Sequence, residues 1–554
     1  MAARLGEPLP PGDEHAVSVS LPTWRDTLGW AHRDARVLSH FKAGYPRFFV
    51  PHLVRDLAVK LVGWARQHRQ PIPASGVSAM LFPSGIMAEA CDGYLKKRCG
   101  CIEAFIGCLR VQFDGSIKSI NGTPSTRPGD HVYMVLHPDS LGLEAKAFWQ
   151  HTGFGISSRF AAFWLKHAPF LGGKQGPSAS LPVADAQEAA LALRQRIASL
   201  YSTEMNKVSV DDVFLYHTGM SAIAHAASAL RRLSSHADKG YRFAVFGFPY
   251  VDTFKVLSKV HGFDCVLYGH ASTSEMDALE AELQSGMRLD ALVTEFPGNP
   301  LLRSLDLGRL VTLSRKYGFF VVIDDTIGTA VNLDIVSSCD IICTSLTKMF
   351  SGACNVMGGS TVLNPRSEHH RALRAALSDL HQDTYFPLDV IVMNQNSAGF
   401  ESRVLMASRN AQRLVQRLRR HSIVDKVFYP WGSPTQHLYD CFKRPGGEYG
   451  YLLSIQFFEP AAAMAFFDAL DVAKGPSLGT NFTLSCAYTL LAHASELDWA
   501  AKYGVSEHLV RISVGIEEQE SLVALIDAAL AAVESFGQPP EGRQKLENGE
   551  KRPF

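Results

Sequence analysis

A short string in the middle of the chain places a lysine and two hydroxyls directly after an apolar run. The string IICTSLTK (341–348) carries Ser345 and Thr347 and ends at Lys348. Burial at such a position depresses the pKa of a lysine, and a neutral amine is what Schiff-base chemistry requires. The hydroxyls can donate hydrogen bonds to a phosphate. The string therefore predicts an amine that captures a carbonyl group beside an anion-binding site.

Two further strings supply an anion site and an acid. Gly219 and Met220 follow VFLYHT (213–218) and open a helical pattern, whose first N–H groups and positive dipole end attract an anion. Asp324 follows FFVVI (319–323), where its carboxylate can pair with a positive ring nitrogen. At an effective dielectric of about 20, such a pair about 4 Å apart is worth roughly 4 kcal/mol before desolvation. An amine, a phosphate site and this carboxylate together favour pyridoxal phosphate as cofactor.

Each of these features also has an ordinary structural explanation. Most lysines in such strings are solvated surface residues, an aspartate after a strand often caps a helix, and a glycine before a helix is common. The joint order favours the chemical interpretation, because ligands of doubly wound sheets bind beyond the carboxyl ends of the strands.

The surrounding segments must therefore form such a sheet. Strand patterns alternate with helical patterns at 184–202, 213–218, 219–233, 243–248, 291–296, 307–318, 319–324 and 340–345. The apolar, β-rich run at 319–324 is typical of a strand buried on both faces. We expect an α/β fold with a parallel sheet covered on both sides by helices.

The rest of the chain is less regular. After residue 365 a helical stretch continues to about residue 420, followed by an α+β region with a strand at 450–458 and helices at 461–470 and 518–536. Upstream, 53–68 is helical, 101–113 fits helix or strand, and residues 16–150 carry no motif that predicts chemistry. We expect an N-terminal extension (1–150, with 1–15 disordered), a cofactor-binding large domain (151–365), a linker helix with a C-terminal α+β domain (366–537) and a disordered tail (538–554).

The composition of the 554 residues excludes several classes of partner. Lys+Arg and Asp+Glu both number 54, so no overall basic excess attracts nucleic acid or a membrane surface. The N-terminus lacks an apolar signal region and no apolar run reaches the length of a membrane span, so we expect a cytoplasmic protein. The spacing of Cys91, Cys99, Cys101 and Cys108 lacks the paired pattern of a zinc site, and we expect no metal.

Longer strings extend the motif pattern over nearly the whole chain: VSLPTW (19–24), GYPRFF (44–49), GISSRF (155–160), YHTGMSAI (216–223), FGFPYVDT (246–253), EFPGNP (295–300), IDDT (323–326), SLTKMFSGACNVMGGS (345–360), KGPSLGTNFTLSCAYTLLAH (474–493), ELDWAAKYGV (496–505) and LVRISVG (509–515). With these strings the chain resembles the cystathionine γ-synthase family of Cys/Met-metabolism enzymes, and most closely its fungal members. The resemblance implies an aspartate-aminotransferase-like (fold type I) pyridoxal-phosphate enzyme with a mixed, mostly parallel sheet.

The resemblance implies a role for individual residues around the cofactor. Lys348 matches the lysine that forms the Schiff base and then moves protons, and Asp324 matches the partner of the pyridine nitrogen. Tyr250 matches the tyrosine stacked on the ring, so Lys348 and Tyr250 are the expected catalytic residues. The phosphate cradle corresponds to Gly219, Met220, Ser345 and Thr347.

Four further matches lie around the substrate and the subunit contact. Asn299, Ser477 and Arg511 match groups near the ring hydroxyl and the substrate carboxylate. The apolar neighbours of Arg511 predict a buried strand, where the alternative is an internal ion pair with Asp or Glu. Arg159 matches the arginine that reaches the phosphate of a neighbouring subunit, which implies a homodimer or homotetramer.

At three positions the chain departs from many bacterial relatives. Ser157 replaces a tyrosine that precedes the phosphate-binding arginine by two positions, and Asp325 replaces the asparagine after the pyridine-pairing aspartate. Pro476 replaces an acid on the acceptor side of the site. The last departure bears directly on the identity of the acceptor.

The reaction implied by the resemblance is γ-replacement on O-acetyl- or O-succinylhomoserine, with cysteine as acceptor and cystathionine as product. An alternative keeps the same vinylglycine-type electrophile and uses a carbon nucleophile, as in specialised metabolism. A third possibility is a catalytically inactive scaffold that only binds the cofactor. The presence of Lys348, Asp324, Tyr250 and Arg511 argues against the scaffold.

Overall fold

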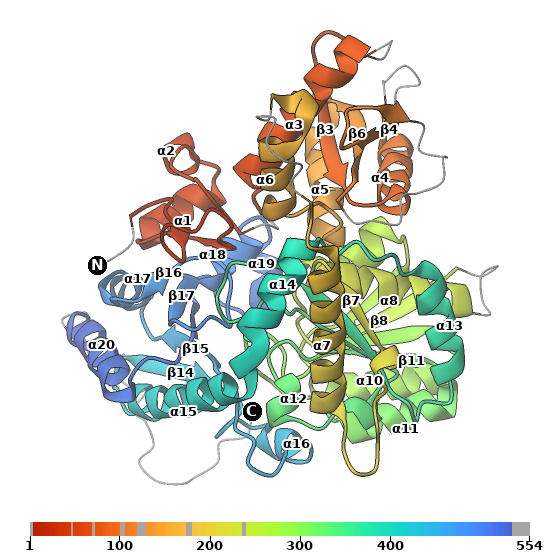
Figure 1. The fold of residues 1–554 in the computed structure, drawn as a ribbon. Helices are drawn as coiled ribbons and strands as arrows, with labels where there is room; N and C mark the ends of the chain where they lie inside the picture. Colours follow the sequence, from red (N-terminus) through yellow and green to blue (C-terminus); the bar gives the residue numbers. More distant parts are fainter. Residues whose placement is uncertain are drawn as a thin grey trace.

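The computed structural model describes residues 4–45, 48–68, 72–99, 106–118, 129–172, 180–234 and 240–534. Three β-sheets, each with its own helices, make up most of the described chain (Figure 1). In the view of Figure 1, the sheet of the N-terminal body lies above the central sheet, and the sheet of the C-terminal body lies to its left.

The central sheet has seven strands in the order β7-β13-β12-β11-β10-β8-β9. Their bounds are Val213–Tyr216 (β7), Arg242–Phe246 (β8), Asp264–Tyr268 (β9), Ala291–Glu295 (β10), Phe320–Asp324 (β11), Ile341–Thr344 (β12) and Gly359–Leu363 (β13). The strands from β12 to β9 pair in parallel, whereas β13 pairs antiparallel with both β12 and β7. The expected mixed, mostly parallel sheet is confirmed.

Alternate side chains of these strands pack against different helices, because successive residues of a strand point to opposite faces. Leu292 and Ile323 belong to a core shared with α7 (Val183–Tyr201), α10 (Thr273–Gln284) and α11 (Leu307–Tyr317). Val293 and Val322 belong to a second core, shared with α8 (Gly219–Leu233) and α13 (His370–Leu380). Short helices α9 (Val251–Lys255) and α12 (Thr329–Asn332) follow the ends of β8 and β11. Both faces are covered, which fixes the ends of the strands as the place for a site.

The C-terminal body has a five-stranded sheet in the order β14-β15-β18-β17-β16. These strands are Val424–Phe428 (β14), Leu452–Phe457 (β15), Ala473–Lys474 (β16), Leu484–Ala487 (β17) and Val510–Ser513 (β18). The expected helical stretch consists of α13, α14 (Pro387–Asn396) and α15 (Phe400–Arg419). The remaining helices are α16 (Gln436–Asp440), α17 (Pro460–Ala469), α18 (Tyr488–His493), α19 (Leu497–Lys502) and α20 (Gln519–Ala531).

The N-terminal body contains a four-stranded antiparallel sheet in the order β3-β6-β4-β5. Its strands are Val77–Phe82 (β3), Gly107–Gln112 (β4), Ile117–Lys118 (β5) and His131–Pro138 (β6), so the described part of the ambiguous segment 101–113 is a strand. The helices around it are α3 (His52–His68), α4 (Gly85–Arg98), α5 (Gly142–Thr152) and α6 (Ser158–His167). Before them come β1 (Pro8–Leu9), β2 (Ser18–Val19), α1 (Trp24–Ala31) and α2 (Ala35–Leu38).

The structure corrects three of the expected boundaries. Residues 4–15 are not disordered, because β1 pairs with β2 and the segment packs on the rest of the chain. The boundary at residue 150 falls inside α5, and α6 still packs in the N-terminal core. The boundary at residue 365 separates α13 from the central sheet, although Leu373 and Leu377 of α13 are buried against that sheet. The expected tail, 538–554, lies outside the described residues.

Candidate active site

One cavity lies where the parallel strands of the central sheet end. It is lined by all the site residues predicted from the sequence except Arg159, namely Gly219, Met220, Tyr250, Asn299, Asp324, Ser345, Thr347, Lys348, Ser477 and Arg511. The carboxyl ends of parallel strands meet at one edge of a sheet, so residues distant in sequence converge there. The C-terminal body closes the cavity with residues from β17, α18 and β18.

Lys348 is buried at the centre of this cavity, with 7% of its surface exposed. It follows β12, and its Nζ donates hydrogen bonds to Tyr45 Oη at 2.9 Å and to Ser477 Oγ at 3.1 Å. Both partners are neutral hydroxyls. The amine is therefore held in place without an ion pair to either of these groups, as a nucleophilic amine requires.

The N-terminus of α8 forms one end of the cavity. Thr218 caps the helix by accepting a hydrogen bond from Ser221 N, and Gly219 and Met220 occupy the first two helical positions. A Cβ on Gly219 would lie 2.7 Å from Ser345 Cβ, so only glycine allows the two segments to approach this closely. First-turn N–H groups, the Ser345 hydroxyl and the Thr347 hydroxyl thus surround a space suited to a phosphate.

Two carboxylates, those of Asp324 and Glu295, also line the cavity. Asp324 Oδ1 accepts hydrogen bonds from Thr326 N at 3.0 Å and from Thr326 Oγ1 at 2.6 Å. Glu295 accepts hydrogen bonds from the backbone N–H groups of Tyr250 and Asn299. Burial raises the pKa of both carboxyl groups, and the charge of Asp324 raises that of Glu295 further. A cation placed beside them would relieve this cost.

Asp325 faces away from the cavity. Its carboxylate accepts hydrogen bonds from Tyr201 Oη and, at 2.5 Å, from Thr344 Oγ1, while burial raises its pKa to about 7. Its side chain is structural, which explains why an aspartate is accommodated where many relatives have asparagine. Asp324 is the member of the pair that lines the cavity.

Arg511 forms the wall contributed by β18. Its Nη1 donates to Asn299 Oδ1 at 3.0 Å, its Nη2 donates to the Ser477 carbonyl at 2.8 Å, and its guanidinium lies 4.8 Å from the Tyr488 ring centroid. No carboxylate of the described chain lies within 4.0 Å of it, so the alternative of an internal ion pair is not supported there. Ser477 is held with a φ of 103°, a left-handed conformation unusual for serine and found at ligand sites.

Arg159 lies outside this cavity. Its Nη1 donates to the Asn355 carbonyl at 2.6 Å and pairs with Asp389 Oδ1 at 3.2 Å. It lines a neighbouring cavity together with residues of the N-terminal segment, and Met357 borders both cavities. Within one chain, Arg159 therefore does not reach the α8 N-terminus.

Two of the sequence departures have local explanations. Ser157 is the N-cap of α6, where its side chain accepts a hydrogen bond from Phe160 N at 3.1 Å. Pro476 lines the cavity, and its carbonyl accepts a hydrogen bond from Ser18 Oγ. Sequence reasoning missed Glu295 and Tyr45 as site residues, although EFPGNP and GYPRFF contain them.

Family models match two parts of the chain. Residues 189–531 match the model for the Cys/Met metabolism PLP-dependent enzymes, and residues 53–157 match that for the N-terminal domain of fungal trans-sulfuration enzymes. The first match covers more than half of the chain. The protein therefore belongs to the pyridoxal-phosphate-dependent enzymes of Cys/Met metabolism.

Relatives narrow this assignment. The chain is 35% identical to the cystathionine gamma-synthase of Neurospora crassa over 97% of this chain and 99% of the relative. It is 38% identical to the cystathionine gamma-synthase-like protein ankD of Aspergillus thermomutatus, over 96% and 94%. It is an enzyme of the cystathionine γ-synthase family, a γ-substitution transferase.

The fold agrees with this assignment. A crystal structure of cystathionine gamma synthase from Xanthomonas oryzae pv. oryzae, in complex with aminoacrylate and cysteine, matches with a TM-score of 0.54 and 23% identity over 64% of this chain and 88% of that chain. Its likeness confirms the expected fold type I. No helix within the described residues is long and apolar enough to cross a membrane.

The residues of the cavity fit pyridoxal phosphate. The close approach of Gly219 and Ser345 leaves a cradle of donors for the phosphate. Lys348 would supply the amine, and the half-buried carboxylate of Asp324 suits a protonated ring nitrogen. The phosphate cradle, the amine and the carboxylate all line the same cavity, so one cofactor molecule can contact all three.

Proposed function

We propose that this enzyme catalyses γ-replacement on O-acetyl- or O-succinylhomoserine with cysteine as acceptor, giving cystathionine. The observation that carries the proposal is Arg511, a buried cation in the same cavity as Lys348 whose hydrogen bonds to Asn299 and Ser477 go to neutral acceptors. A guanidinium in this state suits the α-carboxylate of an amino acid, which it can bind through two parallel hydrogen bonds. The similarity to proteins named cystathionine gamma-synthase supports the same reaction.

Individual residues of the chain have different roles in this reaction. Bound pyridoxal phosphate supplies an electron sink for the substrate's α carbon. Arg511 anchors the carboxylate, which brings the α carbon toward Lys348. Lys348 Nζ takes the α-proton and then a β-proton, while the C–O bond at the γ carbon breaks and the acyloxy group leaves as a carboxylate. The acceptor sulfur then bonds to the γ carbon, its proton is released, and protons return to the β and α carbons.

The remaining residues hold and orient the cofactor. Asp324 pairs with the positive charge of the ring nitrogen, and the geometry of its carboxylate is fixed by Thr326. The α8 N-terminus, Ser345 and Thr347 hold the phosphate. Since all these groups are assembled in one cavity, the inactive-scaffold alternative has no structural support.

A carbon acceptor is the second candidate, and Pro476 favours it. Many bacterial relatives carry an acid at this position on the acceptor side, whereas here Pro476 lines a cavity that also includes the apolar side chains of Phe48, Leu478 and Leu491. A zwitterionic acceptor such as cysteine needs polar partners, while an enolisable carbonyl compound needs fewer.

A single assay separates the candidates. The purified holoenzyme is incubated with O-acetyl- or O-succinylhomoserine and either cysteine or a β-keto ester, and products are measured by mass spectrometry. Cystathionine formation supports the proposal, and Lys348→Ala should abolish it together with the visible absorption of the bound cofactor. Product formed only with the carbon acid favours the second candidate. No change in the visible absorption on adding either ester would contradict both.

A further inference from the structure

A residue of the N-terminal segment touches the reactive amine. Tyr45 is 7% exposed and lines the same cavity as Lys348. Its Oη accepts the hydrogen bond from Lys348 Nζ at 2.9 Å, and Nζ lies 4.5 Å from the centroid of its ring. Tyr45 Oη is also 3.5 Å from Tyr250 Oη. The amine is therefore contacted by both the hydroxyl and the aromatic face of Tyr45.

Residues shortly before Tyr45 in the chain contact the segment that precedes Ser477. Leu21 N donates to the Lys474 carbonyl at 2.8 Å, and Ser18 Oγ donates to the Pro476 carbonyl. A Cβ on Gly475 would collide with the carbonyl oxygen of Val19, so this contact is backbone to backbone. The N-terminal segment thus supports the residues next to Ser477, the second partner of Lys348.

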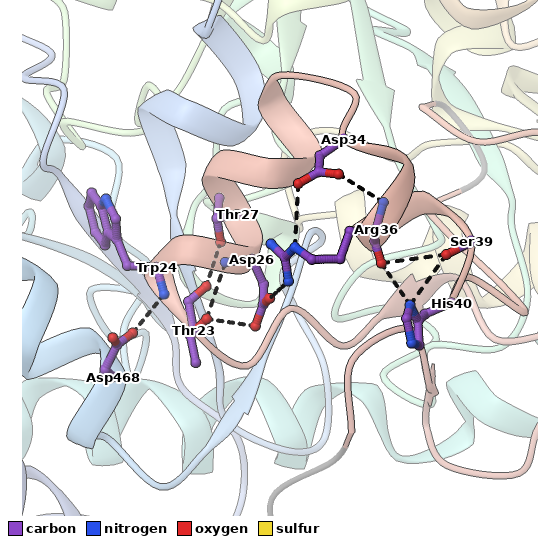
Figure 2. A network of polar contacts seen from close by, with 9 residues as sticks. All are labelled: Thr23, Trp24, Asp26, Thr27, Asp34, Arg36, Ser39, His40 and Asp468. Atoms are coloured by element: carbon purple, nitrogen blue, oxygen red, sulfur yellow. Dashed lines mark hydrogen bonds and ion pairs between the residues drawn. The ribbon is translucent and has the colours of Figure 1, made fainter.

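Polar contacts link α1 to α2, and one of them joins the segment to Asp468 of the C-terminal body (Figure 2). Trp24 N donates to Asp468 Oδ1 at 2.6 Å, and Arg36 reaches Asp26 at 3.3 Å and Asp34 at 3.4 Å. The Trp24 ring lies in edge contact with Phe467, with centroids 5.7 Å apart. The Trp24 contacts thus join α1 to the C-terminal body, and the Arg36 contacts join α2 to α1.

An apolar cluster connects α1 and α2 to the cavity. Val19, Leu21, Val37 and Phe41 are buried together and pack against Leu491, which also lines the cavity. Phe41 is four residues before Tyr45, so the path from the anchored helices to the tyrosine is short.

We propose that Tyr45 is a catalytic residue of this enzyme, which stabilises the ammonium form of Lys348 after it takes a proton from the substrate. In that step a C–H bond breaks, an N–H bond forms on Nζ, and the electron pair stays on the substrate's α carbon. Tyr45 Oη accepts an N–H of the ammonium and keeps its own proton, while its ring face attracts the same cation. Tyr45 thereby favours transfer of the proton from the substrate to Lys348. The inference rests on the proposed function only in taking Lys348 as the base.

Exchange of the substrate's α-proton in D2O tests this step without an acceptor. The holoenzyme is mixed with O-acetylhomoserine or L-alanine, and deuterium at the α carbon is followed by NMR. Tyr45→Phe keeps the ring and removes the acceptor, and we expect exchange to slow roughly tenfold to a hundredfold. Tyr45→Leu removes the ring as well and should be slower still.

Tyr94→Phe is the matched control. Tyr94 lies on α4 in the N-terminal body, is buried to a similar degree and does not line the cavity. It should leave the exchange rate unchanged. Cofactor content, read from the visible absorption, should be equal in all four proteins.

Three results would overturn the inference. One is exchange at the wild-type rate in Tyr45→Phe. Another is loss of cofactor or of folded structure in Tyr45→Phe, which would make the tyrosine a structural residue. The third is a wild-type enzyme that exchanges neither amino acid, since Lys348 would then not act as the base. Exchange without cystathionine formation would contradict the proposed acceptor and leave the result for Tyr45 intact.

Discussion

Glu295 and Asp324 lie directly opposite each other, as partners in the register at the ends of the parallel strands β10 and β11. Both are half-buried, and desolvation together with the charge of the neighbouring carboxylate raises the pKa of Glu295 above its ordinary value of 4.5. Two carboxylates so placed cannot both be charged without cost unless a cation joins them. The pair therefore links the stability of the cofactor-free protein to pH.

The Glu295→Gln variant should reveal this linkage. The pKa of Glu295 is higher in the folded protein than in the unfolded protein. The contribution of this group to stability is therefore complete below the unfolded pKa of 4.5 and is lost as the pH rises through the folded pKa. Cofactor-free wild type should therefore lose stability toward neutral pH, by about 1.4 kcal/mol for each unit of pKa shift. The variant should show a flatter dependence in urea titrations at several pH values. Parallel curves for the two proteins would contradict the raised pKa.

Asp324→Asn should slow turnover by roughly a thousandfold, since about 4 kcal/mol of charge interaction with the ring nitrogen is removed. The measurement is kcat with O-acetylhomoserine and cysteine. Asp325→Asn is the matched control. It disturbs the contacts with Tyr201 and Thr344, so it should cost about 1–3 kcal/mol of stability with a small effect on turnover. The reverse pattern would show that Asp325 holds the ring nitrogen.

Arg511→Lys should lower kcat/KM for the homoserine ester roughly tenfold or more, because lysine keeps the charge but loses the two-pronged geometry. The visible absorption of the bound cofactor should be unchanged. The KM of the acceptor should change much less, as the acceptor enters after the ester is anchored. An effect confined to the acceptor would assign the carboxylate to another residue.

Arg159→Ala should weaken cofactor binding, because we propose that Arg159 reaches the phosphate of a neighbouring subunit in a homodimer or homotetramer. In one chain Arg159 is held by Asn355 and Asp389, outside the Lys348 cavity. Sedimentation of the wild type should give a dimer or tetramer, and equilibrium dialysis should give a higher cofactor Kd for the variant. A fully active wild-type monomer would exclude this role.

The sequence alone determined the fold class and most of the cavity, because both depend on local patterns. The apolar runs at 319–324 and 340–345 form β11 and β12 with nearly the expected bounds. Asp324 ends β11, Gly219 and Lys348 lie shortly after the ends of β7 and β12, and strands that run in the same direction bring their carboxyl ends together. The short antiparallel strand β13 was missed, because GSTVL mixes polar and apolar residues within a longer motif.

Only the tertiary structure decided which side chains face the cavity and which distant segments meet there. Asp324 and Asp325 are adjacent in sequence, but neighbouring residues of an extended chain point to opposite sides, so only one lines the cavity. Tyr45 meets Lys348 across 303 positions, through the docking of α1 and α2 on the C-terminal body. Such a contact depends on the packing of whole bodies, which no local pattern around either residue encodes.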